Sequence, residues 1–220
     1  MKTVKFIWAT SLCVALSMGI ASCGHEHEYV DLGLSVKWAT CNVGASSPEE
    51  YGDYYAWGET ETKDTYDWST YKWCKGSRET LTKYCNDSEF GTVDDKMVLE
   101  SSDDVAQVKW GGKWRMPTKE EIEELRENCT WTETTQGGKN GYRVTSQVNG
   151  NSIFLPAAGY RDGSSFNDMD SCGSYWSTSL YTNRFVNIPY LAQEVDFKWS
   201  IVSVSRDRRC EGLSVRPVCP

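Results

Sequence analysis

Apolar and polar residues alternate in short runs along most of the chain after residue 28, as in strands with one buried face. Residues 30–38 predict a hairpin of two short strands. A second hairpin is predicted where residues 142–148 and 152–157 flank Asn149 and Gly150, a dipeptide that favours a two-residue type I′ turn. The further predicted strands are residues 173–179, 194–197, 201–205 and 213–218.

One helix is predicted to begin after Thr118, which is placed to act as its N-cap. Glu121 follows three residues later and completes the sequence of a capping box. Ile122, Leu125 and Cys129 then recur at i, i+3 and i+7, which predicts one buried stripe. The acidic residues between them predict a solvated face rather than a catalytic group.

The remaining segments of the chain help to predict the fold class. Residues 94–107 carry weak helical spacing, and residues 59–90 are polar and predict a long surface loop. A helix followed by an antiparallel set of strands predicts an α+β domain with a small antiparallel or mixed sheet, one clear helix and long loops. We expect this domain to span residues 29–220, after a short tether at residues 23–28.

The first residues have the three parts of a lipoprotein signal peptide. Lys2 and Lys5 form a positive n-region, and residues 6–19 are uncharged and mostly apolar, shorter than a spanning helix needs. Residues 20–23, Ile-Ala-Ser-Cys, resemble a lipobox, which predicts removal of residues 1–22 and lipidation of Cys23. The alternative is an ordinary secretory signal that is cleaved elsewhere.

A doubly or triply acylated cysteine holds a protein stably on a membrane. We therefore expect an outer membrane lipoprotein of the cell envelope, attached through its N-terminal lipid, with the domain at the cell surface or facing the periplasm.

Charge and histidine content exclude several functions. The formal net charge is −8, and it becomes −10 when residues 1–22, with their two lysines and no acids, are removed. Such a surface repels phosphates, so nucleic acid is not expected as a partner. Both histidines, His25 and His27, lie in the tether, which excludes histidine acid–base or triad chemistry from the domain. They and their glutamates can bind a divalent metal, but a flexible tail is the preferred interpretation, and no metal or cofactor is expected.

The mature chain has an odd number of cysteines beside Cys23, so at least one stays reduced or pairs between chains. Bridges at 74–85 or 210–219 would close short loops in an oxidising compartment. We expect no full disulfide framework. The cysteines are Cys41, Cys74, Cys85, Cys129, Cys172, Cys210 and Cys219.

Tryptophan and tyrosine are unusually frequent, at ten and twelve against six phenylalanines. Aromatic rings with a polar atom suit binding surfaces, although core packing explains many of them. Trp176 is predicted in the core, and Arg216 is predicted to pair with a buried carboxylate. Residues 181–190 interleave Tyr, Asn and Arg, a composition typical of adaptable recognition loops.

Six segments in order resemble the Fibrobacter succinogenes major paralogous domain family, found as surface lipoproteins of Bacteroides-type bacteria. They are DLGLSVKWA (31–39), YGDYYAWG (51–58), WRMPT (114–118), LPAAGYR (155–161), YWST (175–178) and GLSVRPV (212–218). The resemblance covers roughly residues 30–220. It implies a C-type-lectin-like fold that pairs the terminal strands and places residues 160–212 at the ligand-facing end.

This placement and the loop composition give a set of predicted ligand-binding residues. They are Tyr160, Arg161, Tyr175, Tyr181, Asn183, Arg184, Asn187 and Tyr190. Calcium-dependent lectins of this fold carry Glu-Pro-Asn or Gln-Pro-Asp with Trp-Asn-Asp, and neither occurs here. The reactive cysteine pair of formylglycine-generating enzymes has no matching context around Cys210 and Cys219.

The leading hypothesis is a non-catalytic surface module for binding or adhesion, with a carbohydrate or protein as ligand. One alternative is a structural subunit or cap of a surface fibre. Another is a protein varied by a diversity-generating retroelement, whose variable positions would include the loop tyrosines and asparagines. The enzyme alternative is a glycan hydrolase that uses Asp162, Asp168 and Asp170.

Overall fold

The structure is a computed structural model that describes residues 27–185, 187–198 and 200–220. The predicted signal peptide, Cys23 and His25 lie outside the described residues. Among the described helices, none combines the length and apolar character needed to cross a membrane.

The predicted α+β class, with its C-type-lectin-like domain, was wrong. The described residues instead form mainly β-sheet with two short helices, α1 (Val105–Trp110) and α2 (Lys119–Asn128). Helical spacing in residues 94–107 contributes only to α1. Asp104 caps α1 by accepting from the Gln107 N–H at 3.1 Å, and Gly111, at φ +65°, ends it. Residues 94–103 are therefore not helical.

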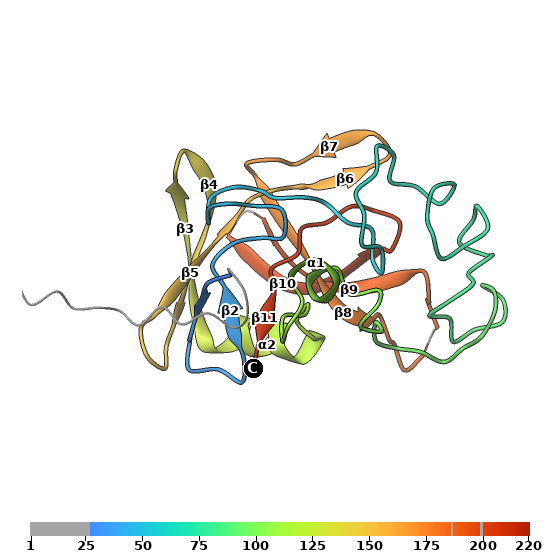
Figure 1. Cartoon of the computed structure of the whole chain (residues 1–220), viewed down its shortest axis with the longest axis horizontal. Coiled ribbons are helices and arrows are strands. Elements are labelled where there is room, and N and C mark those ends of the chain that lie inside the picture. The colour runs from blue at the N-terminus through green and yellow to red at the C-terminus, as the bar shows by residue number, and fades with distance from the viewer. Residues whose placement is uncertain (1–26, 186, 199) are drawn as a thin grey trace, which may run out of the picture.

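The strands of the described residues form four small antiparallel sheets instead of one large sheet (Figure 1). Two of them have the orders β3-β4-β5 and β10-β9-β8, and the third is the β6–β7 hairpin. Their bounds are β3 (Cys129–Gln136), β4 (Lys139–Ser146), β5 (Ser152–Pro156), β6 (Tyr160–Asp162), β7 (Ser165–Asn167), β8 (Cys172–Leu180), β9 (Leu191–Lys198) and β10 (Ile201–Arg208).

The fourth sheet brings the two ends of the domain together. It has the order β1 (Tyr29–Val30), β2 (Lys37–Ala39), β11 (Val218–Cys219), with Trp38 opposite both Val30 and Val218. The predicted hairpin at residues 30–38 and the implied pairing of terminal strands are therefore present. The predicted strand at residues 213–218 is confirmed only at its end, where β11 begins.

The predicted second hairpin is present as β4 and β5, but its turn differs from the expectation. The Ser146 N–H donates to the Asn151 carbonyl at 2.8 Å, and Gly150, at φ +77°, closes the loop between them. A four-residue loop therefore replaces the two-residue turn.

Helix α2 matches its prediction because its signals are local. The Thr118 hydroxyl accepts from the Glu121 N–H at 3.3 Å, and the Glu121 carboxylate accepts from the Thr118 N–H at 2.8 Å. Ile122, Leu125 and Cys129 are all buried against the sheets. The capping box and the buried stripe are confirmed.

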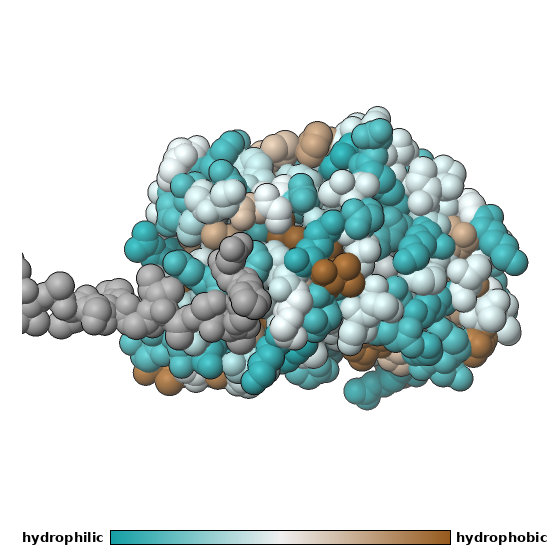
Figure 2. Space-filling view, in the orientation of Figure 1, coloured by the Kyte–Doolittle hydropathy of each residue, from teal (hydrophilic) through white to brown (hydrophobic). Residues whose placement is uncertain are grey.

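Residues 59–90 lack regular structure, but they do not form only a surface loop. Tyr66, Tyr71, Leu81, Tyr84 and Cys85 from this segment are all buried. All of them except Tyr84 belong to a third hydrophobic cluster, which is separate from the two clusters that include residues of the sheets. On the outside, the face in Figure 2 is mostly polar, with scattered apolar residues.

Two fully buried arginines, Arg209 and Arg216, hold segments without regular structure in place by donating hydrogen bonds to their backbone carbonyls. The Arg209 guanidinium donates to the carbonyls of Lys83, Tyr84 and Pro189 at 2.8–3.1 Å. Arg216 does not pair with a carboxylate as expected. It donates to the Asn42 side-chain oxygen and to the carbonyls of residues 39 and 40, and burial lowers its pKa.

Neither of the two short-loop disulfides that the spacing allowed is present among the described residues. Cys74, Cys85 and Cys210 carry free thiols, so neither the 74–85 nor the 210–219 bridge is present. Trp176 lies in the core as predicted, with its indole N–H donating to the Tyr55 carbonyl at 2.8 Å.

Candidate functional site

The structure disperses the predicted ligand-binding residues, and one of them is a core residue. Tyr175 is only 2% exposed, and its hydroxyl donates to the Pro156 carbonyl at 2.6 Å. Its ring stacks on Phe197 with centroids 6.0 Å apart. A surface ligand does not reach this side chain, so its predicted role in ligand contact does not fit the structure.

Four of the predicted residues lie between β8 and β9, at the surface. The Asn183 side-chain oxygen accepts from the Phe185 N–H at 2.8 Å, and its amide donates to the Tyr181 hydroxyl at 3.1 Å. Arg184 lies 5.9 Å from the Phe185 ring, which is 84% exposed. Asn187 accepts a hydrogen bond from the Asn86 amide at 3.4 Å.

Tyr190 lies away from that surface group. Its ring packs against Phe90 and Trp68, with centroids 5.3 and 6.4 Å apart, and belongs to the margin of the third cluster. Tyr160, on β6, packs against the second cluster. These two rings mainly support the fold.

Arg161, also on β6, lines a hollow of about 510 Å³ that we call the Arg161 hollow. A hollow of this size is within the range of small-molecule sites. Its lining comes from residues 51–54, residues 62–66, the β6–β7 hairpin and Met169 just after the hairpin. The lining residues are Tyr51, Gly52, Asp53, Tyr54, Thr62, Lys63, Asp64, Tyr66, Arg161, Phe166 and Met169.

The guanidinium of Arg161 is held in one orientation. It lies between the rings of Tyr66 and Phe166, at 4.9 and 4.4 Å from their centroids. Its terminal nitrogens donate to the carbonyls of Lys63, Asp64 and Ser164 at 2.8–3.2 Å. Arg161 makes no ion pair with any described residue, so three carbonyl dipoles and two aromatic rings are the groups that face its charge.

The floor of the hollow is rigid because backbone pairs hold it. Tyr66 and Gly163 exchange two backbone hydrogen bonds of 2.8 and 2.9 Å, which ties the 62–66 segment to the hairpin turn. Gly212 lies behind Tyr66, where a Cβ would stand 2.6 Å from the ring. The Tyr66 hydroxyl donates to the Tyr54 carbonyl at 2.5 Å.

The rim of the hollow combines apolar and charged groups. Phe166 is 53% exposed and Met169 is 41% exposed, whereas most apolar side chains of this size in the protein are buried. Asp53 and Asp64 are exposed carboxylates, and Asp53 accepts from the Tyr55 hydroxyl at 3.1 Å. The site therefore offers an aromatic face, one oriented guanidinium and two carboxylates.

Of the residues that line this hollow, Arg161 was predicted as a binding residue and the others were not. Phe166 and Met169 lie among the aspartates that the hydrolase alternative considered. Asp64 is 97 residues from Arg161, in the segment that was expected to be a surface loop. The available sequence signal at Phe166 was an apolar residue just after the turn at Gly163. Nothing local in the sequence points to Asp64.

The three aspartates of the hydrolase alternative each have a separate partner. Asp162 pairs with Arg208 at 2.9 Å, and Asp168 pairs with Lys198. Asp170 accepts a hydrogen bond from the Tyr51 hydroxyl. Each of these carboxylates is therefore engaged by a different side chain of the protein.

The acids whose pKa values are raised most lie on β9 and just after the end of β10. Burial raises the pKa of Glu194 well above its ordinary value and raises the pKa of Glu211 to about 9. Both side chains are almost fully buried, and one carboxyl oxygen of Glu194 has no hydrogen-bond partner. Across the described residues, no three acidic, cysteine or histidine side chains are placed to hold a metal ion.

Comparison of the chain with models of known protein families, with curated proteins and with solved structures found no match.

Proposed function

We propose that this protein is a non-catalytic lipoprotein of the outer membrane that binds a carbohydrate in the Arg161 hollow. The observation that carries the proposal is the exposed Phe166 ring beside a guanidinium fixed by three backbone carbonyls. The resemblance to the major paralogous domain family and the lipobox at residues 20–23 support the cell-surface role.

A sugar ring suits this combination of groups. Its C–H face packs on an aromatic ring, while its hydroxyls need donors and acceptors at fixed positions. Arg161 supplies the N–H groups that are not donated to its three backbone carbonyls, and the carboxylates of Asp53 and Asp64 supply the acceptors. Because the protein has already ordered these groups, little conformational entropy is lost on binding.

The test is binding of the full chain to a glycan array, with two phenylalanines compared. We expect Phe166→Ala to abolish binding, because it removes the stacking face, and Phe185→Ala to leave it unchanged. Phe185 is the matched control, since it is the more exposed ring and lies in the 181–190 segment. Loss of binding in the Phe185 variant alone would place the site in that segment and contradict the proposal.

A further inference from the structure

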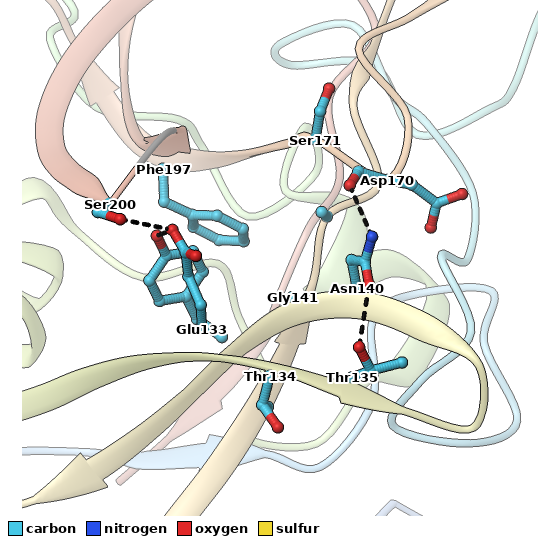
Figure 3. Close-up of a pocket in the computed structure, with 11 residues that line it drawn as sticks. Glu133, Thr134, Thr135, Asn140, Gly141, Asp170, Ser171, Phe197 and Ser200 are labelled. Carbon is cyan, nitrogen blue, oxygen red and sulfur yellow. Dashed lines mark hydrogen bonds between the residues drawn. The ribbon is translucent and has the colours of Figure 1, made fainter.

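A hollow of about 600 Å³ lies between the β3–β4 hairpin and the loop before β8, and its acidic groups already have partners within the protein (Figure 3). The Glu133 carboxylate accepts from the Tyr142 and Ser200 hydroxyls at 2.7 and 2.8 Å. The Asp170 carboxylate is turned away from Glu133 in Figure 3, and the Tyr51 hydroxyl donates to it. A smaller recess elsewhere differs, because it contains an enclosed polar group without a partner.

This recess, of about 230 Å³, lies where the first turn of α2 meets the end of β8, the start of β9 and the second half of β10. We call it the Gln193 recess. It is lined by Lys119 and Glu123 of α2, Tyr181 and Thr182 after β8, Gln193 of β9 and residues 204–206 of β10.

Hydrogen bonds between the surrounding elements form the recess in advance of any ligand. The Lys119 N–H donates to the Ser179 hydroxyl at 3.1 Å, which joins the start of α2 to β8. The Tyr181 N–H donates to the Leu191 carbonyl at 3.1 Å, which joins the end of β8 to the start of β9. Little reorganisation is therefore needed for binding.

Gln193 is the enclosed polar group. It continues the face of β9 that carries Val195 and Phe197, and both of these pack in the first hydrophobic cluster. Gln193 is only 5% exposed, and its side-chain amide forms no hydrogen bond with any other described residue. Because enclosed polar groups nearly always have a partner, we look for that partner in the recess that Gln193 lines.

Arg206 lies beside Gln193, since the two residues are directly opposite each other in the β9–β10 pair and share one face of the sheet. Its guanidinium lies 5.1 Å from the centroid of the Tyr181 ring. Arg206 is exposed and forms no ion pair with any described residue. A guanidinium that stacks on a ring keeps its N–H edge for a planar acceptor, and a carboxylate accepts two such N–H groups side by side.

Lys119 brings a second positive charge to the recess, and Glu123 offsets part of it across 3.4 Å. The lining therefore carries two cations against one carboxylate, although the formal net charge of the chain is −8. Near physiological salt, charges more than about 10 Å away are largely screened, so the groups of the recess decide which ligand it favours. They favour an anion.

We propose that the Gln193 recess binds the carboxylate-bearing ring of a uronic acid sugar. Arg206 donates charge-assisted hydrogen bonds to the carboxylate, and Lys119 adds its charge. The Gln193 amide both donates and accepts, as does the Thr182 hydroxyl, which suits the hydroxyls of a sugar. A volume of about 230 Å³ is below the range of sites for drug-sized ligands and suits a single ring. This site uses other residues than the Arg161 hollow and does not depend on the function proposed there.

The test is a titration of the full chain with methyl β-glucuronide at pH 7, followed by the NMR signals of the Gln193 side-chain amide. Methyl β-glucoside is the neutral counterpart, and acetate is the acid without the sugar. We expect a saturable shift with the glucuronide and at least tenfold weaker binding of the other two, because each lacks one part of what the recess recognises. Equal affinity for the glucuronide and either counterpart, or no saturable shift, overturns the proposal.

Two variants change the charge of the recess in opposite directions. Arg206→Gln should weaken glucuronide binding about tenfold, the effect of losing a charge-assisted hydrogen bond. Glu123→Gln should strengthen it several-fold, because it removes the carboxylate that competes for Lys119. Unchanged affinity in Arg206→Gln, or weaker binding in Glu123→Gln, refutes the proposed contacts.

Two control variants make these results specific. Glu127→Gln removes a carboxylate from the same helix, where it pairs with Arg126 outside the recess, and should leave the affinity unchanged. Phe166→Ala alters the rim of the Arg161 hollow and should also leave it unchanged. If Glu127→Gln strengthens binding as much as Glu123→Gln does, only net charge is at work and the proposal is wrong. If Phe166→Ala abolishes binding, the acidic sugar binds in the Arg161 hollow instead.

Discussion

Replacement of Arg209 by methionine tests how the long irregular segment is held. Arg209 is fully buried, lies 4.9 Å from the Trp57 ring and makes no ion pair in the described part of the chain. Its four hydrogen bonds go to the carbonyls of residues 83, 84 and 189 and to the Tyr71 hydroxyl. Methionine fills much of the same volume but donates nothing.

The expected loss of unfolding free energy follows from the carbonyl acceptors that would lose their donor. Three buried carbonyls would lose a donor, and each unsatisfied group costs about 1–3 kcal/mol. Removal of a buried charge offsets part of this loss. We therefore expect Arg209→Met to lower the free energy of unfolding by about 3–5 kcal/mol, and Tm by about 10 °C for a domain of this size.

The assay is urea unfolding followed by tryptophan fluorescence, since Trp57 lies against the mutated side chain. Arg206→Met is the matched control. Arg206 is exposed and lies over the Tyr181 ring, so its loss should change stability by less than about 0.5 kcal/mol. A loss below about 1 kcal/mol in Arg209→Met would refute the role of Arg209 as the fastener of residues 59–90.

Three further predictions concern pH, backbone geometry and the anchor. Because folding raises the pKa of Glu194 above its ordinary 4.5, the native state keeps a proton that the unfolded state has lost, and stability falls as pH rises above that value. Glu194→Gln should therefore lose less Tm than the wild type between pH 5 and pH 9, and parallel curves would contradict this. Gly159→Ala should destabilise by several kcal/mol in chemical unfolding, because φ is +64° and a Cβ would stand 2.1 Å from the Asn167 carbonyl. Gly150→Ala, at φ +77° in open space, should cost only about 1–2 kcal/mol. Cys23→Ala should abolish incorporation of labelled palmitate and release the protein from membranes, and continued labelling would disprove the anchor.

The elements that could be predicted from sequence depend on neighbours along the chain. The capping box at Thr118 and Glu121 lies within one turn, so α2 was predictable in position and orientation. Alternation identified β4, β5 and β8 for the same reason. The fold class was wrong because one clear helix was given too much weight, although α1 and α2 together are only sixteen residues.

The contacts that assemble the molecule were not predictable in this way. Arg209 reaches the carbonyl of Tyr84, 125 residues away, and Arg161 reaches that of Asp64, 97 residues away. No periodicity or short motif records such partners. Because Asp64 lies 97 residues from Arg161, no local pattern connects the two, and only Arg161 was predicted as a binding residue.

The three inward-facing arginines explain how a domain with so little helix supports defined hollows. Arg161, Arg209 and Arg216 each donate to backbone carbonyls in segments without regular structure, which satisfies acceptors that a helix or sheet would otherwise satisfy. A lysine has one nitrogen and reaches fewer acceptors in a plane, so the guanidinium group is the suitable donor. Arg161 holds Lys63 and Asp64 against β6, and Arg209 holds residues 83 and 84 of the same irregular segment beside Pro189. Because residues 62–66 of this segment line the Arg161 hollow, Arg209→Met should weaken sugar binding there. Sugar binding that is unchanged in Arg209→Met would show that the Arg161 hollow keeps its shape without the bonds that Arg209 makes.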